Sequence, residues 1–127
     1  MSPQHPSDVT PIGSWDRLLD GRVAVVTGAG AGIGAAIASL FAGHGALVEM
    51  AEVDEDRARR TRQAIEDEGG TVRAHIVDVT APADVERLAT DVLAEHGRVD
   101  VLVNNVGDYR PLVRFEDSTP ESWSAMY

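Results

Sequence analysis

Residues 27–34 read Thr-Gly-Ala-Gly-Ala-Gly-Ile-Gly and lie between two apolar stretches of different period. Before them, residues 23–26 form a Val-Ala-Val-Val run, whose length and β-branched content are typical of a buried strand. After them, apolar residues recur at helical spacing from 33 to 44, and Gly45 follows as a stop signal. Glycines at such a strand-to-helix turn let the backbone bend sharply and let a phosphate group approach the N–H groups at the start of the helix.

The two patterns alternate through the rest of the chain. The sequence predicts further strands at residues 46–51, 71–77 and 99–103, and further helices at residues 54–68 and from Pro82 to Gly97. Thr80 is expected to cap the second of these helices, and Ser118-Thr-Pro-Glu121 has the pattern of a capping box that opens one more. Apolar strands joined by helices predict an α/β fold with a doubly wound parallel sheet that helices cover on both faces.

The composition limits the functions that the chain can have. The 127 residues carry 11 Lys plus Arg, all of them arginine, against 21 Asp plus Glu, for a net charge of -10. An acidic surface repels phosphate backbones, so we expect no nucleic-acid partner. There is no cysteine and no long apolar segment, and residues 1–14 contain few large apolar groups. We therefore expect a cytoplasmic protein without a membrane span, with a flexible leader over residues 1–14 and a folded domain over residues 15–127.

The glycine-rich segment fits some known motifs and not others. A strict GxGxxG pattern fails, because the sixth position from Gly28 or Gly30 is Ile33 or Ala35. The phosphate-binding loop of nucleotide triphosphatases fails too, since it needs a Gly-Lys pair and the chain has no lysine. The pattern that fits is TGxxxGxG, and in it the chain resembles the short-chain dehydrogenase/reductase family.

Three further motifs follow the later strands in the order of that family. They are Glu52 after the second strand, Asp78-Val79 after the third and Asn104-Asn-Val-Gly107 after the fourth, so that the resemblance covers about residues 18–127. Each has a simpler alternative when taken alone: an exposed acid, a turn former and an ordinary Asn-Gly loop. Together, the resemblance implies a site for a nicotinamide dinucleotide formed by Gly28, Ala31, Gly32, Ile33, Glu52, Asp78, Val79, Asn104, Val106 and Gly107.

The resemblance also implies which dinucleotide is bound. A carboxylate at Glu52 can accept hydrogen bonds from both hydroxyls of the adenosine ribose, and its charge would repel a 2′-phosphate. Ala31 is neutral where members that prefer NADP often carry a basic residue. Both features favour NAD over NADP as the cofactor.

The fold and chemistry of the family are only partly represented in this sequence. The family's sheet has the order 3-2-1-4-5-6-7, of which this chain would supply 3-2-1-4, an incomplete Rossmann-type sheet whose fourth strand is an exposed apolar edge. Members transfer hydride with the help of a Ser, a Tyr and a Lys in a YxxxK arrangement. Neither Tyr109 nor Tyr127 is followed by a lysine, so no catalytic residue is assigned.

Two functions therefore remain open. The first is an NAD-dependent short-chain dehydrogenase/reductase, present here as a truncated partial domain that is inactive alone. The second is a non-catalytic dinucleotide-binding or interaction module. In either case NAD is the expected small-molecule partner, and the exposed fourth strand predicts self-association. No metal site is expected at the scattered histidines His5, His44, His75 and His96.

Overall fold

A computed structural model describes residues 17–107 and 115–121. In chain order, its elements are β1 (Val23–Thr27), α1 (Gly32–Gly43), β2 (Leu47–Glu52), α2 (Glu55–Asp67), β3 (Thr71–Ile76), α3 (Pro82–His96), β4 (Val101–Val103) and the short 3-10 helix η2 (Phe115–Asp117). The predicted strands and helices are confirmed, with their bounds shifted by two residues or fewer. The helix expected at the capping box begins at Pro120. The predicted leader lies outside the described residues.

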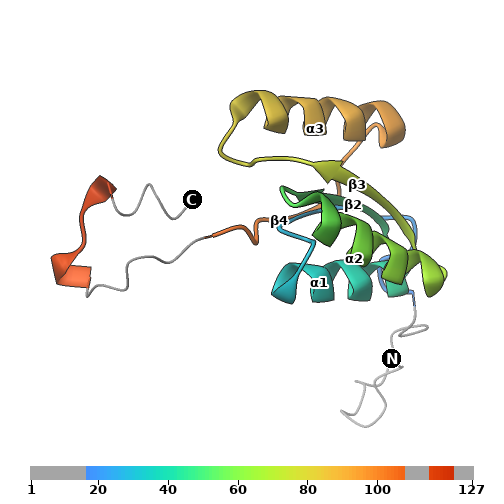
Figure 1. The fold of residues 1–127 in the computed structure, drawn as a ribbon. Helices are drawn as coiled ribbons and strands as arrows, with labels where there is room; N and C mark the ends of the chain where they lie inside the picture. The colour runs from blue at the N-terminus through green and yellow to red at the C-terminus, as the bar shows by residue number, and fades with distance from the viewer. Residues whose placement is uncertain (1–16, 108–114, 122–127) are drawn as a thin grey trace, which may run out of the picture.

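The four strands form one parallel sheet with the order β3-β2-β1-β4. Figure 1 shows α1 and α2 on one face of this sheet and α3 on the other. The predicted doubly wound sheet with strand order 3-2-1-4 is therefore confirmed. Because the strands are parallel, their carboxyl ends lie at one edge of the sheet, where ligands bind in open α/β folds.

The core consists of two apolar layers, one on each face of the sheet at β1. All residues of β1 are buried. Ala24 and Val26 belong to the layer under α1 and α2, whereas Val23 and Val25 belong to the layer under α3. Full burial of a valine side chain contributes roughly 1.5–3 kcal/mol, so the central strand is held from both faces. No helix in the described part of the chain is both long enough and apolar enough to cross a membrane.

The helix α3 is attached through a small apolar contact. Of its residues, Leu88 and Val92 are buried, and they pack into the layer around β1. Its first turn differs from the prediction, because the N-cap residue is Ala81 and no side chain caps the helix. Thr80 does not act as the cap because its hydroxyl and N–H groups both donate to Oδ1 of Asp78 instead.

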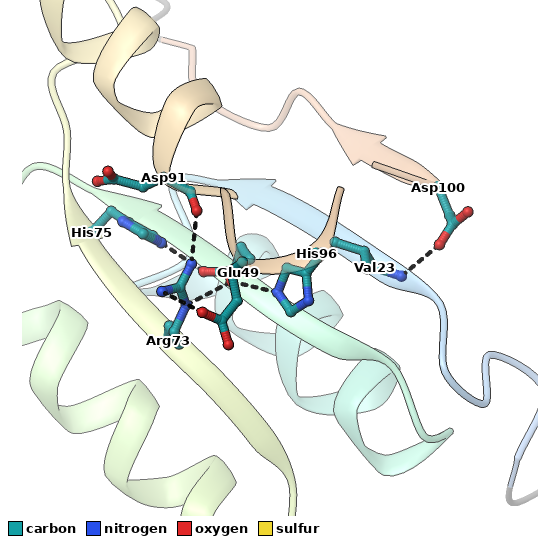
Figure 2. A network of polar contacts seen from close by, with 8 residues as sticks. Val23, Glu49, Arg73, His75, Asp91, His96 and Asp100 are labelled. Atoms are coloured by element: carbon teal, nitrogen blue, oxygen red, sulfur yellow. Dashed lines mark hydrogen bonds and ion pairs between the residues drawn. The ribbon is translucent and has the colours of Figure 1, made fainter. Parts of the chain in front are cut away.

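A buried carboxylate on β2 adds polar contacts to α3. Glu49 is 1% exposed, and Figure 2 shows the side chains of Arg73, His75 and His96 converging on it. Nε of Arg73 donates to Oε1 at 2.7 Å, Nε2 of His75 donates to Oε2 at 2.6 Å, and Nε2 of His96 donates to Oε1 at 2.7 Å. Since His96 is the last residue of α3, Glu49 joins β2, β3 and α3.

The surroundings of Glu49 keep it ionised. Burial alone would raise the pKa of this carboxyl group, but the hydrogen bonds from His75, Arg73 and His96, with the positive charge of Arg73, hold the pKa below the ordinary value of 4.5. A carboxyl group with a lowered folded-state pKa stabilises the fold above its unfolded pKa, and the stabilisation is lost as the pH falls through the folded-state value. Glu49 therefore helps to hold α3 at neutral pH.

Replacing Glu49 with Gln removes the charge and nearly preserves the shape of the side chain. We expect the free energy of unfolding at neutral pH to fall by about 2 kcal/mol, because hydrogen bonds to charged groups contribute about 1.5–3 kcal/mol. The difference from the wild type should shrink as the pH falls from 4.5, the ordinary pKa, through the lower folded-state pKa at which the wild-type carboxylate becomes protonated. Urea denaturation at a series of pH values measures both effects.

The matched control for this prediction is Glu95→Gln. Glu95 is an exposed partner of Arg73, 3.8 Å away, and exposed ion pairs contribute little to stability. We expect this variant to unfold like the wild type. An equal loss of stability in the Glu49 and Glu95 variants would contradict the role assigned to the buried carboxylate.

Candidate functional site

The turn between β1 and α1 is folded tightly at the carboxyl edge of the sheet. Gly28 and Gly32 have φ angles of +63° and +57°, which residues with a side chain rarely adopt. Gly34 is required for a different reason, because a Cβ atom there would lie 2.1 Å from the carbonyl oxygen of Gly28. The first turn of α1 thus packs directly against the end of β1.

The start of α1 has no side-chain cap. Its N-cap residue is Ala31, which offers no side-chain acceptor, and the first turn contains no acidic residue. The first N–H groups of a helix have no partner inside the helix, and the helix dipole places partial positive charge beside them. The start of α1 can therefore receive a phosphate group.

The ends of β1 and β4 are joined by Thr27 and Asn105. The hydroxyl of Thr27 donates to the carbonyl of Val103 at 3.2 Å and accepts the N–H of Asn105 at 3.0 Å. The side chain of Asn105 donates in turn to the carbonyl of Gly28 at 3.3 Å. These bonds hold the segment after β4 against the glycine-rich turn.

Glu52 is the last residue of β2, and its side chain is turned toward backbone donors. The residue is 7% exposed. Its Oε1 accepts the N–H of Gly30 at 3.0 Å, and its Oε2 accepts the N–H groups of Val53 and Asp54 at 2.8 and 3.1 Å. A carboxylate has about four acceptor positions. About one position is therefore left for a ligand hydroxyl, where the sequence predicts hydrogen bonds to two.

Asp78 follows β3 and shapes the segment that leads into α3. Its Oδ1 accepts the hydroxyl of Thr80 at 2.6 Å and the N–H of Thr80 at 2.9 Å. Its own N–H donates to Oδ2 of Asp84, on α3, at 2.9 Å. The pKa of Asp78 is lowered mainly by the hydrogen bond from the Thr80 hydroxyl and next by the one from the Thr80 N–H group. Asp78 is therefore an ionised residue that fixes this turn.

A cleft of about 370 Å³ lies between these segments. It brings together seven predicted site residues, namely Gly28, Ala31, Glu52, Asp78, Val79, Val106 and Gly107. Three predicted residues are not part of its lining: Gly32 and Ile33 are the exposed first residues of α1, and Asn104 is exposed after β4. The lining also contains six residues that were not predicted, which are Ala51, Val53, Arg57, Val77, Thr80 and Asn105.

Two of the residues that were missed differ in how well the sequence indicates them. Asn105 belongs to the same Asn-Asn-Val-Gly segment as the predicted Asn104, and its position one residue later in that segment is the signal. Arg57 is one of several arginines on the charged helix α2. Only the fold brings it beside Glu52, so the sequence pattern could not single it out.

These features define a dinucleotide-binding site of the open α/β type. The uncapped helix start suits a pyrophosphate, the carboxylate of Glu52 suits a ribose hydroxyl, and the apolar Val77 and Val79 can pack on a base. Among the described residues of the lining there is no Ser, Tyr, Lys or His to exchange a proton with a substrate. Within the ranges 17–107 and 115–121, no three His, Cys, Asp or Glu side chains are grouped to hold a metal ion. The described lining therefore offers groups that suit a dinucleotide, and it contains none of the Ser, Tyr or Lys side chains that the resemblance implies for proton transfer.

Comparison with known proteins assigns the family. The family model described as short chain dehydrogenase matches residues 22–127. The chain therefore belongs to the short-chain dehydrogenase/reductase family, whose fold binds nicotinamide dinucleotides. The chain is 39% identical over 111 residues to D-threitol dehydrogenase of Mycolicibacterium smegmatis, and the match covers 87% of this chain and 42% of that protein.

Two solved structures illustrate the likeness. A metagenomic short-chain oxidoreductase in complex with NADP is 41% identical with a TM-score of 0.71, covering 85% of this chain and 49% of that one. A 7 alpha-hydroxysteroid dehydrogenase complexed with NADH and 7-oxo glycochenodeoxycholic acid is 37% identical with a TM-score of 0.74, covering 84% and 41%. The chain thus spans less than half the length of these relatives. One of these structures contains NADP and the other NADH. The likeness therefore indicates a nicotinamide dinucleotide without choosing between the two.

The close packing of the glycine-rich turn leads to a prediction for Gly34. In Gly34→Ala the new methyl group would lie 2.1 Å from the carbonyl oxygen of Gly28 and 2.6 Å from Nδ2 of Asn105. We expect the free energy of unfolding to fall by about 3 kcal/mol, because forcing atoms into a packed interior costs about 1–3 kcal/mol or more. Urea denaturation measures the loss.

Gly43 provides the control, since it lies on the same helix and has open space around it. Alanine is favoured over glycine in helices by about 0.5–1 kcal/mol. Gly43→Ala should therefore be as stable as the wild type or slightly more stable. If Gly34→Ala behaved in the same way, the close contact between α1 and β1 would be wrong.

Proposed function

We propose that these residues form the dinucleotide-binding half of an NAD-dependent oxidoreductase that transfers hydride between the nicotinamide and an alcohol or carbonyl group. The observation that carries the proposal is the cleft at the carboxyl ends of the strands, with the uncapped start of α1 on one side and Glu52 on another. Membership of the dehydrogenase family supports the class of reaction. When bound, the nicotinamide would supply or accept the hydride.

The proposed roles follow the position of each residue around the cleft. The turn and the start of α1 would surround the pyrophosphate, and the residues involved are Gly28, Ala31, Gly32 and Ile33. Asp78 and Val79, after β3, would lie beside the adenine, and Glu52 would bind its ribose. The segment after β4 would lie beside the nicotinamide ribose through Asn104, Val106 and Gly107.

The preference for NAD over NADP is part of the proposal and depends on Glu52. Its side chain fills the space beside Gly30, Val53 and Asp54 that a 2′-phosphate would need. Its negative charge would also repel that phosphate. Arg57 lines the same cleft and would attract a phosphate, so it acts against this preference. Glu52 prevails because its carboxylate is held by three backbone donors and is nearly buried.

Removing the side chain of Glu52 should reverse the preference. In Glu52→Ala, the three N–H groups that now bind the carboxylate lose their acceptor and face the cleft beside Arg57. Such converging N–H groups bind anions, so we expect the ratio of NADPH to NADH affinity to rise by at least about tenfold, which corresponds to 1.4 kcal/mol. Titration of the purified chain with NADH and with NADPH, followed by fluorescence, measures the ratio.

The control for this test is Glu55→Ala. Glu55 is an exposed acid at the start of α2 outside the cleft, so its removal changes the net charge equally without touching the proposed ribose site. The ratio should then stay at its wild-type value. An unchanged ratio in Glu52→Ala would refute the cofactor assignment, and no binding of either dinucleotide to the wild type would refute the proposed function.

The proton-transfer step is not assigned to these 127 residues. The resemblance implies a tyrosine and a lysine four residues later for that step, and the sequence contains no lysine. We propose that the chain alone binds and orients the dinucleotide without turning over a substrate. The groups of this chain that act on the cofactor would then bind its phosphates, ribose and base.

An interaction module is the second candidate function, and the edge strand β4 is the observation in its favour. Among the described strands, β4 pairs with β1 alone, and Leu102 is 57% exposed at this edge. The N–H and C=O groups of an unpaired edge can form hydrogen bonds with a strand of another chain. We propose that a second copy of this chain covers the edge with its own β4.

Self-association through β4 predicts a specific effect of charge at residue 102. The purified chain should sediment as a dimer at high concentration, and Leu102→Arg should sediment as a monomer, because a charge on an edge strand opposes pairing. Leu40→Arg places the same charge at an equally exposed leucine on α1 and should leave the dimer intact. A wild-type chain that stays monomeric at the highest concentration would contradict the proposal.

A further inference from the structure

Gly30, in the middle of the glycine-rich turn, is held through both of its backbone polar groups. Its N–H donates to Oε1 of Glu52 at 3.0 Å, and its carbonyl accepts the hydroxyl of Thr61 at 3.0 Å. Glu52 ends β2, and Thr61 lies on α2. The turn is therefore attached to two elements that are distant from it in the sequence.

The packing around Gly30 leaves no space for a side chain. A Cβ atom there would lie 2.5 Å from Oε1 of Glu52, 2.6 Å from its Cγ and 2.7 Å from Cβ of Arg57. Unlike Gly28 and Gly32, Gly30 does not have a positive φ angle. Glycine is thus needed at this position because the turn approaches β2 and α2 so closely.

Thr61 is a buried polar residue that the cleft does not include. It is 8% exposed and lies with Ala58 and Ile65 on the buried face of α2. A threonine within a helix can bond to a carbonyl of its own helix one turn earlier. The hydroxyl of Thr61 instead reaches Gly30, which lies 31 residues earlier in the chain.

From these contacts we infer that Thr61 is a positioning residue for the dinucleotide. Together with Glu52 it clamps Gly30, and so it sets the place of the turn between Gly28 and Gly32 relative to the cleft. The two flanking glycines give the turn little stiffness of its own, so its position depends on contacts with other elements, and the bonds to Glu52 and Thr61 are the ones that hold its middle residue. The binding consequence depends on the proposed function, because it assumes that the start of α1 receives the pyrophosphate.

The clamp predicts a different binding effect from that of Glu52. The pyrophosphate is common to NADH and NADPH, so a loss of the Thr61 hydroxyl should weaken both equally and leave their ratio unchanged. We expect Thr61→Val to lower both affinities about fivefold, the size expected for one neutral hydrogen bond. Thr61→Ser keeps the hydroxyl and removes the methyl group, so it should bind both dinucleotides within about twofold of the wild type.

The serine variant separates positioning from general stability. Removing a buried methyl group destabilises a protein, so Thr61→Ser should unfold more easily than the wild type and still bind. Fluorescence titration gives the affinities, and urea denaturation gives the stabilities. If Thr61→Val binds like the wild type, or if both variants lose affinity in proportion to their stability, the inference is wrong.

Amide hydrogen exchange tests the clamp without a ligand. In Thr61→Val the hydrogen-bonded amides of Gly28, Ala29 and Gly30 should exchange faster than in the wild type and in Thr61→Ser, while the amides of β1 stay equally protected. Unchanged exchange in the turn would overturn the clamp even if binding is never observed. Faster exchange in a chain that binds neither dinucleotide would uphold the clamp and refute the proposed function instead.

Discussion

The close contact between Gly34 and the carbonyl oxygen of Gly28 is the constraint on which the rest of the described structure depends. A side chain at Gly34 would overlap with that carbonyl. Because glycine has no side chain, the start of α1 can lie directly on the end of β1. This contact directs the uncapped start of α1 to the carboxyl edge of the sheet. It also leaves the carbonyl of Gly28 within reach of Asn105, so that the segment after β4 meets the turn. Fold and site thus share one steric requirement.

The strand β2 carries two nearly buried carboxylates whose partners differ in kind. Glu49 is satisfied by side chains of β3 and α3, whereas Glu52 is satisfied by backbone N–H groups of the turn and of the segment before α2. Backbone donors are placed by the fold itself, so little further ordering is needed when a ligand arrives. The side-chain donors around Glu49, by contrast, lose rotamer freedom when they are held in place. Glu49 therefore holds α3 on the sheet, whereas Glu52 shapes the cleft.

The sequence predicts the order of the strands and helices well because apolar residues recur with a different period in each. It also predicts those residues of the candidate site that come directly after a strand. The carboxyl ends of the parallel strands lie at one edge of the sheet, so the motifs that follow β1, β2, β3 and β4 could be predicted to lie together from the sequence alone. Contacts between distant elements could not be predicted in this way. The bond from Thr61 to Gly30 and the grouping of His75 and His96 around Glu49 depend on register and on the packing of helices. The expected cap at Thr80 failed for a local reason, since Asp78 takes its hydroxyl.

The two sides of the cleft differ in how firmly the fold holds them. The side formed by the ends of β1, β2 and β3 follows strands of five or six residues, whereas the segment after β4 follows a strand of three. Val106 is 39% exposed, and Asn105 is tied to the turn by its own hydrogen bonds. Segments with few buried contacts open locally at low free-energy cost, and a ligand that orders them binds more weakly for that reason. If a second chain covers the edge of β4, as proposed above, and orders this segment, it strengthens dinucleotide binding, and by linkage the dinucleotide strengthens the pairing by the same factor.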